Sequence, residues 1–326
     1  MAGRPPAPEH VVNVVDILND NAILKEDWNL MELCREFVDN QSVLRWLARH
    51  RLIANAKVCP RCQINCSLTR DVTHLLGFRW TCRVCHWKLS VLHNSFFSRG
   101  HIPVSTMIYL LYCWSADIPQ NVTKHELRIH SRQTIIDWFN FCREICERVI
   151  ARNRIELGGF DDNGESVVVE IDESKYFHRK YHRGNWREGH WVFGAIERQS
   201  GKCFLTEVAA RDANTLLPLI EEHILPGSRI ISDGWGAYGN VATINGGVYA
   251  HDVVIHERNF VDPKDADIHT QNIENMWMRA KRKLKRQFGT HRHLFQSYLS
   301  EFQWRSHNKE NTFEHFIVSI TTLYPF

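Results

Sequence analysis

The chain has 326 residues, of which 44% are apolar and 24% are charged, so it is long enough for two or three domains with at least one sizeable core. No apolar run has the length of a membrane span, and the first residues lack the apolar core of a signal peptide. The formal net charge of +3 is too small to indicate a partner by itself, but the Lys and Arg residues are unevenly distributed along the chain.

The N-terminal part is predicted to be helical. We expect residues 1–10 to be a disordered leader and 11–56 to form a helical domain. Asp27 could cap a helix over 27–39, and apolar residues recur at helical spacing over 41–52. This pattern fits a plain helical domain and a DNA-binding helix-turn-helix equally well.

Four cysteines form two C-x2-C pairs separated by nineteen residues, namely Cys59, Cys62, Cys82 and Cys85. Ten cysteines without a secretory signal indicate a reducing compartment, where such pairs bind metal more often than they form disulfides. Two pairs of this spacing suit a tetrahedral structural zinc. A redox pair would need one C-x2-C only, and the other alternative is four unrelated buried cysteines.

The segment 57–100 is predicted to be a zinc ribbon that contacts a polyanion. Between Lys57 and Arg99 it has seven Lys or Arg residues and one acidic residue, Asp71. This imbalance favours nucleic acid as the partner over a merely solvated face.

Residues 101–157 are predicted to be helical, with an apolar stripe over 107–114 and a break at Pro119. A short turn near 130–131 precedes a helix from about Arg132 to Val149. This arrangement fits a helix-turn-helix, so Arg132 and Gln133 at the start of the second helix are candidate DNA contacts. The glycine-rich stretch 158–165 indicates a loop or a domain boundary.

From residue 166 the pattern changes to strands and helices, and we assign 158–326 to one catalytic domain. Strands are predicted at 166–173, 190–198, 203–210, 228–233 and 248–256. Helices are predicted at 213–224, from about 271, and at about 291–307, with 311–324 closing the domain. Three contiguous strands followed by a helix and a fourth strand predict a ribonuclease-H-like α/β fold.

Three carboxylates are predicted to form one site. Asp172 and Asp233 each follow a β-branched run, and in the predicted fold the first and fourth strands are neighbours. A helix beginning near Gln271 would bring Glu274 in from the side. Such carboxylates repel one another unless cations separate them, and magnesium prefers oxygen ligands. Two ions about 4 Å apart can activate a hydroxyl and stabilise the leaving oxygen in an attack on phosphate.

Two carboxylates flank Asp172. Glu170 and Glu173 are both expected on the opposite face of the strand and are therefore excluded from the metal site. For each aspartate taken alone, a turn or cap residue is the alternative role.

Two basic segments are predicted to contact DNA. Lys281 lies seven residues after Glu274, nearly two helical turns, so both project from one face. In the first segment, cations mixed with aromatic residues suit phosphate contacts and base stacking. In the second, which follows Glu274, a solvated basic helix is the alternative. The candidates are Lys175, Arg179, Lys180, Arg183 and Arg187 in the first segment and Arg279, Arg282, Lys283, Lys285 and Arg286 in the second.

These motifs resemble the catalytic core of Merlin-type cut-and-paste DNA transposases and related bacterial insertion-sequence transposases with an ISXO2-like domain. The resemblance covers about residues 30–310 and includes the cysteine ribbon. It is carried by the stretches Glu-Ile-Asp-Glu-Ser-Lys at 170–175, His178–Gly184, Glu188–Arg198, Ser232–Tyr238, Asn259–Pro263 and His269–Trp277, with Lys281 downstream.

The resemblance implies a DDE transposase. Asp172, Asp233 and Glu274 would bind Mg²⁺ or Mn²⁺, and Lys281 would accompany them; some relatives carry Asn or His as the third residue, which makes Asn272 an alternative. The enzyme would bind terminal inverted repeats, cleave the ends and join the 3′ ends to target DNA. It would act as a dimer or higher oligomer, in the nucleus if the source is eukaryotic and otherwise in the cytoplasm.

Two other functions remain open. One is a domesticated, transposase-derived DNA-binding protein that does not cut. The other is a metal-dependent nuclease that cleaves without joining.

Overall fold

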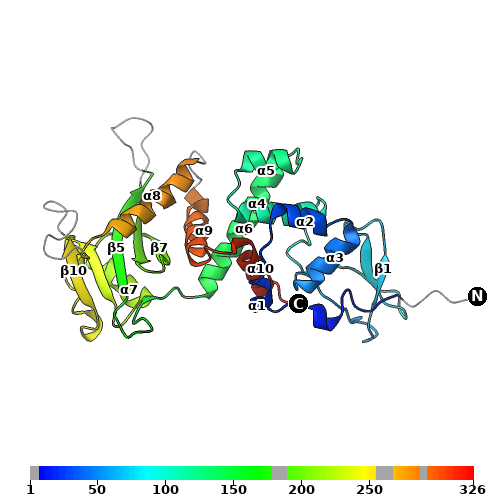
Figure 1. Cartoon of the computed structure of the whole chain (residues 1–326), viewed down its shortest axis with the longest axis horizontal. Coiled ribbons are helices and arrows are strands. Elements are labelled where there is room, and N and C mark those ends of the chain that lie inside the picture. Colours follow the sequence, from blue (N-terminus) through cyan, green and yellow to red (C-terminus); the bar gives the residue numbers. More distant parts are fainter. Residues whose placement is uncertain (1–6, 178–188, 255–266, 287–291) are drawn as a thin grey trace, which may run out of the picture. The chain divides into compact units, whose positions relative to one another are not determined.

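The computed structural model describes residues 7–177, 189–254, 267–286 and 292–326 (Figure 1). The chain divides into two compact units, Met1–Ile145 with Glu310–Phe326 and Cys146–Lys309. The division falls inside helix α6 (Arg132–Arg152). Within the described ranges, no helix combines the length and the apolar character needed to cross a membrane.

The first unit is mainly helical. Its second helix starts after Asn29, whose side chain accepts the N–H of Glu32 in a capping box, so the predicted cap at Asp27 is wrong. Asp39 caps the third helix in the same way. The helices of this unit, besides the first part of α6, are α1 (Asp20–Ile23), α2 (Leu30–Glu36), α3 (Asn40–Arg49), α4 (Val104–Ser115), α5 (Gln120–Glu126) and α10 (Thr312–Leu323).

The C-terminal helix α10 packs in the first unit, although the sequence assigned it to the catalytic domain. The rings of Phe316 and Trp114 lie 4.6 Å apart, and the Glu314 carboxylate accepts the Trp28 N–H at 2.9 Å. One face of α10 is strongly apolar, and α4 and α1 supply the surface that buries it. Hydrophobic periodicity predicts such a face but does not say which helix covers it.

A small antiparallel sheet completes the first unit. Its strands are β1 (Ser67–Arg70), β2 (Phe78–Thr81) and β3 (Lys88–Ser90), in that order. It lies in the predicted ribbon segment, between the two cysteine pairs and just beyond the second.

The second unit is built on a five-stranded sheet of order β10-β9-β5-β6-β7. β6 is antiparallel to both neighbours, whereas β5, β9 and β10 are parallel. This is the ribonuclease-H-like order that the sequence predicts. The strands are β5 (Val168–Tyr176), β6 (His190–Glu197), β7 (Cys203–Val208), β9 (Arg229–Asp233) and β10 (Ala250–Val254), beside a short parallel pair, β4 (Leu157–Gly158) and β8 (Ile224–Leu225).

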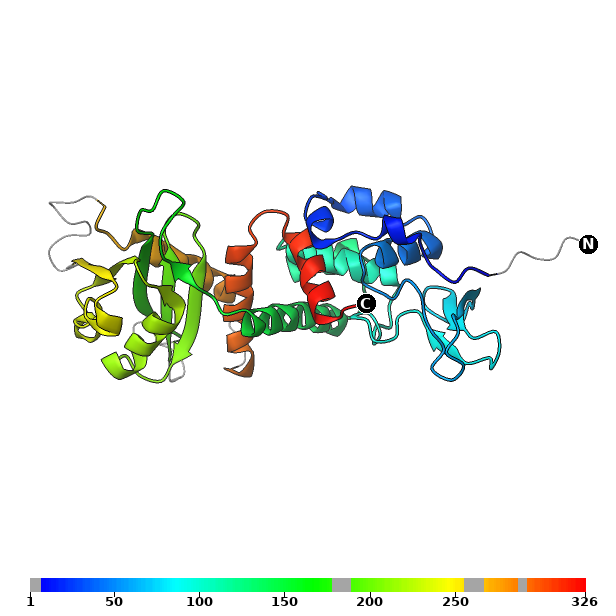
Figure 2. The ribbon, with the colours of Figure 1, turned by 90° about the horizontal axis from the view of Figure 1, so that it is seen from below.

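Helices cover both faces of this sheet (Figure 2). Ile171 packs with α7 (Ala213–His223) on one face. Val192 packs on the other face with α8 (Gln271–Arg286) and α9 (Phe295–His307). Side chains alternate along a strand, so the even-numbered residues of β5 face α8 and the odd-numbered ones face α7.

Candidate active site

Asp172 and Asp233 lie on neighbouring parallel strands. The paired register of β5 and β9 ends with Glu170 opposite Ile231, so two further residues bring Asp172 level with Asp233. Ile230 packs on the α7 face, which places Asp233 on the α8 face together with Asp172. The predicted convergence of these two aspartates agrees with the strand register.

Asp172 is held by neutral donors. Its carboxylate accepts the Glu173 N–H at 2.7 Å and the Trp277 indole N–H at 2.9 Å. In the described part of the chain no Lys, Arg or His forms an ion pair with it. Burial, and then the charges of Asp233 and Glu173, raise the pKa of Asp172 to about 7. Two neighbouring carboxylates without a cation form a site that a divalent cation would stabilise.

Helix α8 runs along β5, and its contacts advance in step with the strand. Ile273 N–H donates to the Glu170 carboxylate at 2.9 Å, Trp277 to Asp172, and Lys281 to the Ser174 hydroxyl. Four helical residues rise about 6 Å and two strand residues about 6.6 Å, so the two repeats match. The helix therefore presents a new hydrogen-bond donor to every second residue of the strand.

Glu170 faces α8, on the same side of β5 as Asp172, which corrects the expected opposite face. Residues two apart on a strand share a face, so the expectation misapplied the alternation. Arg198 pairs with the buried Glu170 carboxylate at 2.9 Å, and the Asn272 side chain donates to it at 2.7 Å. Glu170 is thus fully engaged in holding the start of α8.

Glu274 is exposed in the first turn of α8, one turn before Trp277. It projects from the same flank of the helix as Lys281. Among the described residues, the only group of three or more potential ligands whose donor atoms lie within 4.8 Å of one another is a set of cysteines. Asp172, Asp233 and Glu274 therefore do not form so tight a group here, and their joint metal binding stays a prediction.

The cations of α8 lie in three environments. Lys281 lies beside β5, with its ammonium 5.2 Å from the centre of the Tyr176 ring. Lys283 pairs at 2.6 Å with the buried Glu301 of α9, so it connects two helices. The predicted DNA contacts Arg279, Arg282 and Lys285 are exposed, and the side chain of Arg286 lies outside the described part.

On the α7 face, Glu173 is also fully engaged. Arg211 pairs with its carboxylate at 2.9 Å, and the Tyr238 hydroxyl donates to it. The Arg211 guanidinium lies 4.2 Å from the ring centre of Trp191 and 4.5 Å from that of Trp235. Burial raises the pKa of Glu173, and the hydrogen bonds from Tyr238 and Arg211 oppose that shift.

The sequence interpretation missed Trp277 and Gly194. Gly194 lies opposite Asp172 on β6, and a Cβ there would come within 2.5 Å of two ring carbons of Trp277. The missing side chain lets the indole lie on the sheet and reach Asp172. The signal available was a tryptophan three residues after Glu274, on the same side of a predicted helix.

The cysteine cluster is a separate candidate metal centre in the first unit. The four thiol sulfurs lie within 4.8 Å of one another, and those of Cys59 and Cys85 are 3.5 Å apart. Four thiolates at such separations suit a tetrahedral zinc ion. The cluster consists of Cys59, Cys62, Cys82 and Cys85.

Its two knuckles have the same backbone geometry. Gln63 N–H donates to the Cys59 carbonyl at 2.9 Å, and His86 N–H donates to the Cys82 carbonyl at 3.1 Å. Gln63 and His86 both adopt positive φ, 55° and 56°. Such repeated local turns aim both sulfurs of each pair at one point, which supports the predicted ligand set.

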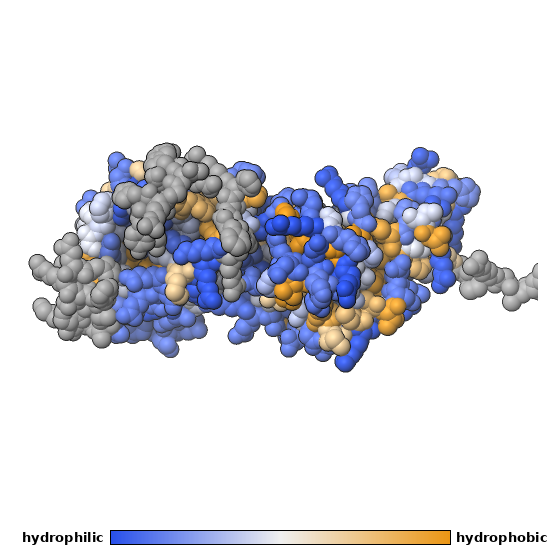
Figure 3. All heavy atoms as spheres, turned by 90° about the horizontal axis from the view of Figure 1, so that it is seen from above, coloured by the Kyte–Doolittle hydropathy of each residue, from blue (hydrophilic) through white to orange (hydrophobic). Residues whose placement is uncertain are grey.

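The other predicted DNA contacts are dispersed. Arg132 and Gln133 are exposed at the start of α6, and the Lys175 ammonium lies 5.3 Å from the Trp191 ring centre. In the face drawn in Figure 3, the surface of the second unit is largely hydrophilic. The candidates Arg179, Lys180, Arg183 and Arg187 lie outside the described residues.

Comparisons with known sequences agree with the motifs. Residues 165–307 match the ISXO2-like transposase domain family. An uncharacterized transposase-like protein of Haemophilus influenzae is 28% identical over 109 residues, which cover 33% of this chain and 84% of that protein. Male abnormal protein mab-31 of Caenorhabditis elegans is 22% identical over 245 residues, 68% of this chain but only 55% of that protein, so this chain spans about half of its length.

Solved structures give weaker likenesses. The catalytic core of the BIV integrase has a TM-score of 0.30 and 15% identity, over 48% of this chain and 97% of that one. The HTLV-2 integrase core in complex with magnesium has a TM-score of 0.27 and 11% identity, over 43% and 83%. These scores are too low to establish a shared fold, which the strand order supports instead. With the family match and the transposase-like relative, the predicted resemblance is confirmed: residues 165–307 are similar to the ISXO2-like transposase domain, and through it to the DDE transposases of bacterial insertion sequences.

Proposed function

We propose that this protein is a metal-dependent DNA transposase that binds terminal inverted repeats, cleaves the transposon ends and joins the 3′ ends to target DNA. The observation that carries the proposal is the pair Asp172 and Asp233, level with each other on parallel strands and without a cationic partner among the described residues. In a chain with an ISXO2-like transposase domain, this pair is the natural centre of the chemistry.

Divalent ions suit the donor set, because carboxylate oxygens are hard ligands, and burial together with the charges of Asp233 and Glu173 raises the pKa of Asp172. Asp172, Asp233 and Glu274 would hold Mg²⁺ or Mn²⁺. Bound ions would supply activation of the attacking hydroxyl and stabilisation of the leaving oxygen.

The remaining residues would orient the site and its DNA. Trp277 and the Glu173 N–H hold the Asp172 carboxylate in place. Lys281, beside Ser174 on the same face of β5, would place a positive charge near the bound phosphate. Glu274 would join the aspartates once ions and DNA neutralise their charge.

The cysteine cluster would hold a structural zinc, and the first unit would recognise the ends. The ribbon combines four thiols with an excess of cations, and α5 and α6 are joined by a short turn with Arg132 and Gln133 exposed. We infer at least a dimer on DNA, because two ends must be processed together.

The deciding experiment is to incubate the purified chain with labelled DNA that carries candidate ends, a target plasmid, and Mg²⁺ or Mn²⁺. Cleavage with joining supports the transposase. Cleavage alone would support a nuclease, and binding alone would support a domesticated DNA-binding protein. Asp233→Asn is the matched control, because it removes one charge and keeps the side-chain shape.

A further inference from the structure

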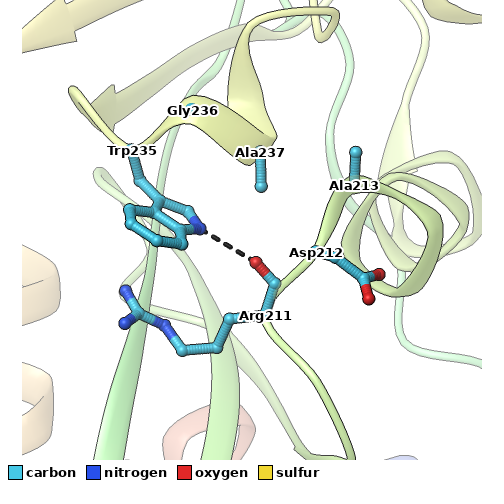
Figure 4. Close-up of a pocket in the computed structure, with 6 residues that line it drawn as sticks. All are labelled: Arg211, Asp212, Ala213, Trp235, Gly236 and Ala237. Atoms are coloured by element: carbon cyan, nitrogen blue, oxygen red, sulfur yellow. Dashed lines mark hydrogen bonds between the residues drawn. The ribbon is translucent and has the colours of Figure 1, made fainter.

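A shallow open pocket lies next to Asp233, at the start of α7, and the proposed chemistry gives it no role. It forms where the chain leaves β7 and enters α7 and where it leaves β9 (Figure 4). Its lining residues are Arg211, Asp212, Ala213, Trp235, Gly236 and Ala237.

The indole of Trp235 is fixed in orientation yet 42% exposed. Its ring N–H donates to the Arg211 carbonyl at 2.9 Å, and the Arg211 guanidinium lies against the ring. Arg211 is itself held by Glu173 and by the Trp191 ring. An exposed aromatic ring that is locked in this way loses little conformational entropy when a ligand stacks on it.

Trp235 also contacts Asp233. Its backbone N–H donates to the Asp233 carboxylate at 3.0 Å. Trp235 follows Asp233 by two residues, so their Cα atoms lie at most about 7 Å apart. This distance is comparable to the spacing of one or two nucleotides along a DNA strand. The pocket is therefore within reach of the nucleotides next to a phosphate bound at Asp172 and Asp233.

The lining indicates the ligand class. Indole carbons, two alanine methyl groups and a glycine offer flat apolar surface (Figure 4). Arg211 is paired with Glu173, and Asp212 brings a negative charge while it caps α7 through Thr215 at 2.9 Å. The negative charge of Asp212 would repel a phosphate, whereas it would not repel the uncharged face of a nucleobase.

We propose that this pocket receives an unpaired base of the DNA substrate, which stacks on Trp235. The base belongs to a nucleotide adjacent to the phosphodiester processed at Asp172 and Asp233. The inference rests on the proposed function and deepens it, since it identifies how the site distinguishes opened ends from paired duplex. Stacking on an exposed aromatic ring tolerates every base, so the pocket selects unpaired DNA rather than a sequence.

The test uses the full chain and two DNA probes. One is a short duplex with a single-stranded overhang that contains 2-aminopurine, and the other is the same duplex with blunt ends. The wild-type chain should bind the overhang probe more tightly and quench its fluorescence. Trp235→Ala should weaken overhang binding by roughly 5- to 150-fold and abolish the quenching, whereas Trp235→Phe should keep part of both.

A second variant guards against loss of folding in Trp235→Ala. A Cβ at Gly236 meets no atom within 4 Å, so Gly236→Leu should fold and fill the pocket, with the same loss of overhang binding. Phe160→Ala is the control: Phe160 is 64% exposed and contacts Gly227, just before β9 begins, at the opposite end of the sheet from Asp233. It should bind both probes as the wild type does.

The inference is overturned if Trp235→Ala and Gly236→Leu both bind and quench the overhang probe as the wild-type chain does. Its failure is distinguishable from failure of the proposed function. Loss of quenching in both variants of a chain that neither cleaves nor joins DNA would keep the base pocket and remove the transposase. If the chain cleaves and joins DNA but both variants quench the probe as the wild type does, the transposase proposal stands and the base pocket is removed.

Discussion

The two candidate metal centres of this chain are built in opposite ways. The cysteine cluster brings four sulfurs within 4.8 Å of one another through two local turns of identical backbone geometry. The carboxylate site draws Asp172, Asp233 and Glu274 from two strands and a helix, and no such tight group forms. A centre made by local turns is complete in the folded chain. A centre made by distant elements leaves like charges in tension until a ligand arrives.

This difference predicts which centre contributes to stability. Structural zinc sites hold their domains together, whereas the carboxylate pair disfavours the metal-free fold. The following experiments test the comparison, from the largest expected effect to the smallest.

Removal of the proposed zinc should unfold the ribbon. We expect Cys82→Ser, or a strong zinc chelator, to remove one zinc per chain and a binding free energy on the order of 10 kcal/mol. Metal analysis and limited proteolysis of the ribbon segment 57–100 would measure this. Cys34→Ser is the control, because Cys34 is exposed and outside the cluster. A wild-type chain without zinc would reject the centre.

Asp172→Asn should reduce the proposed cleavage and joining by about 10³-fold or more, because the proposed metal site loses a ligand. The same variant should stabilise the metal-free fold at neutral pH. The folded chain raises the pKa of Asp172 to about 7, above its unfolded value, so this contribution to stability is present at low pH and is lost as the pH rises through about 7.

Thermal unfolding of the metal-free wild type and of Asp172→Asn across this pH range would measure the second effect. The difference between the two curves should grow in favour of the variant as the pH rises, and added Mg²⁺ should reduce it. Identical pH dependence of the two proteins would contradict the buried, unpaired state of Asp172.

Arg198→Met should cost about 3–5 kcal/mol of unfolding free energy, because it removes the guanidinium that pairs with the buried Glu170 carboxylate. It should also loosen the start of α8 and therefore weaken Mg²⁺ binding. The control is Arg229→Met: Arg229 pairs with Asp252 at 2.6 Å on partly exposed strands, where loss of a pair costs about 0–1 kcal/mol. Equal costs in urea unfolding would show that Glu170 does not hold α8.

Gly194→Ala should cost about 1–3 kcal/mol, since the added methyl group displaces the Trp277 ring from Asp172. DNA cleavage by Gly194→Ala should fall together with its unfolding free energy, because Trp277 no longer holds the Asp172 carboxylate. Gly236→Ala adds its methyl group where no atom lies within 4 Å, so its stability should change by less than about 0.5 kcal/mol. Unchanged urea unfolding of Gly194→Ala would remove Trp277 as a positioning residue.

Much of this protein can be read from local sequence. The C-x2-C spacing determines where two sulfurs point, because both lie on one short turn. The strands around Asp172 and Asp233 follow from β-branched runs that end in a carboxylate, and their order along the chain implies that they are neighbours. Each of these features is decided within a few residues or by a topology with few alternatives.

The tertiary structure decided the features that depend on which surfaces meet. It placed α10 on α4, engaged Glu170 with Arg198, and set Trp277 on the sheet through the gap at Gly194. It also clamped Arg211 between two indoles. Hydrophobic period and charge predict that such residues need partners, but the partner is chosen by packing between segments far apart in the chain, which no local pattern encodes.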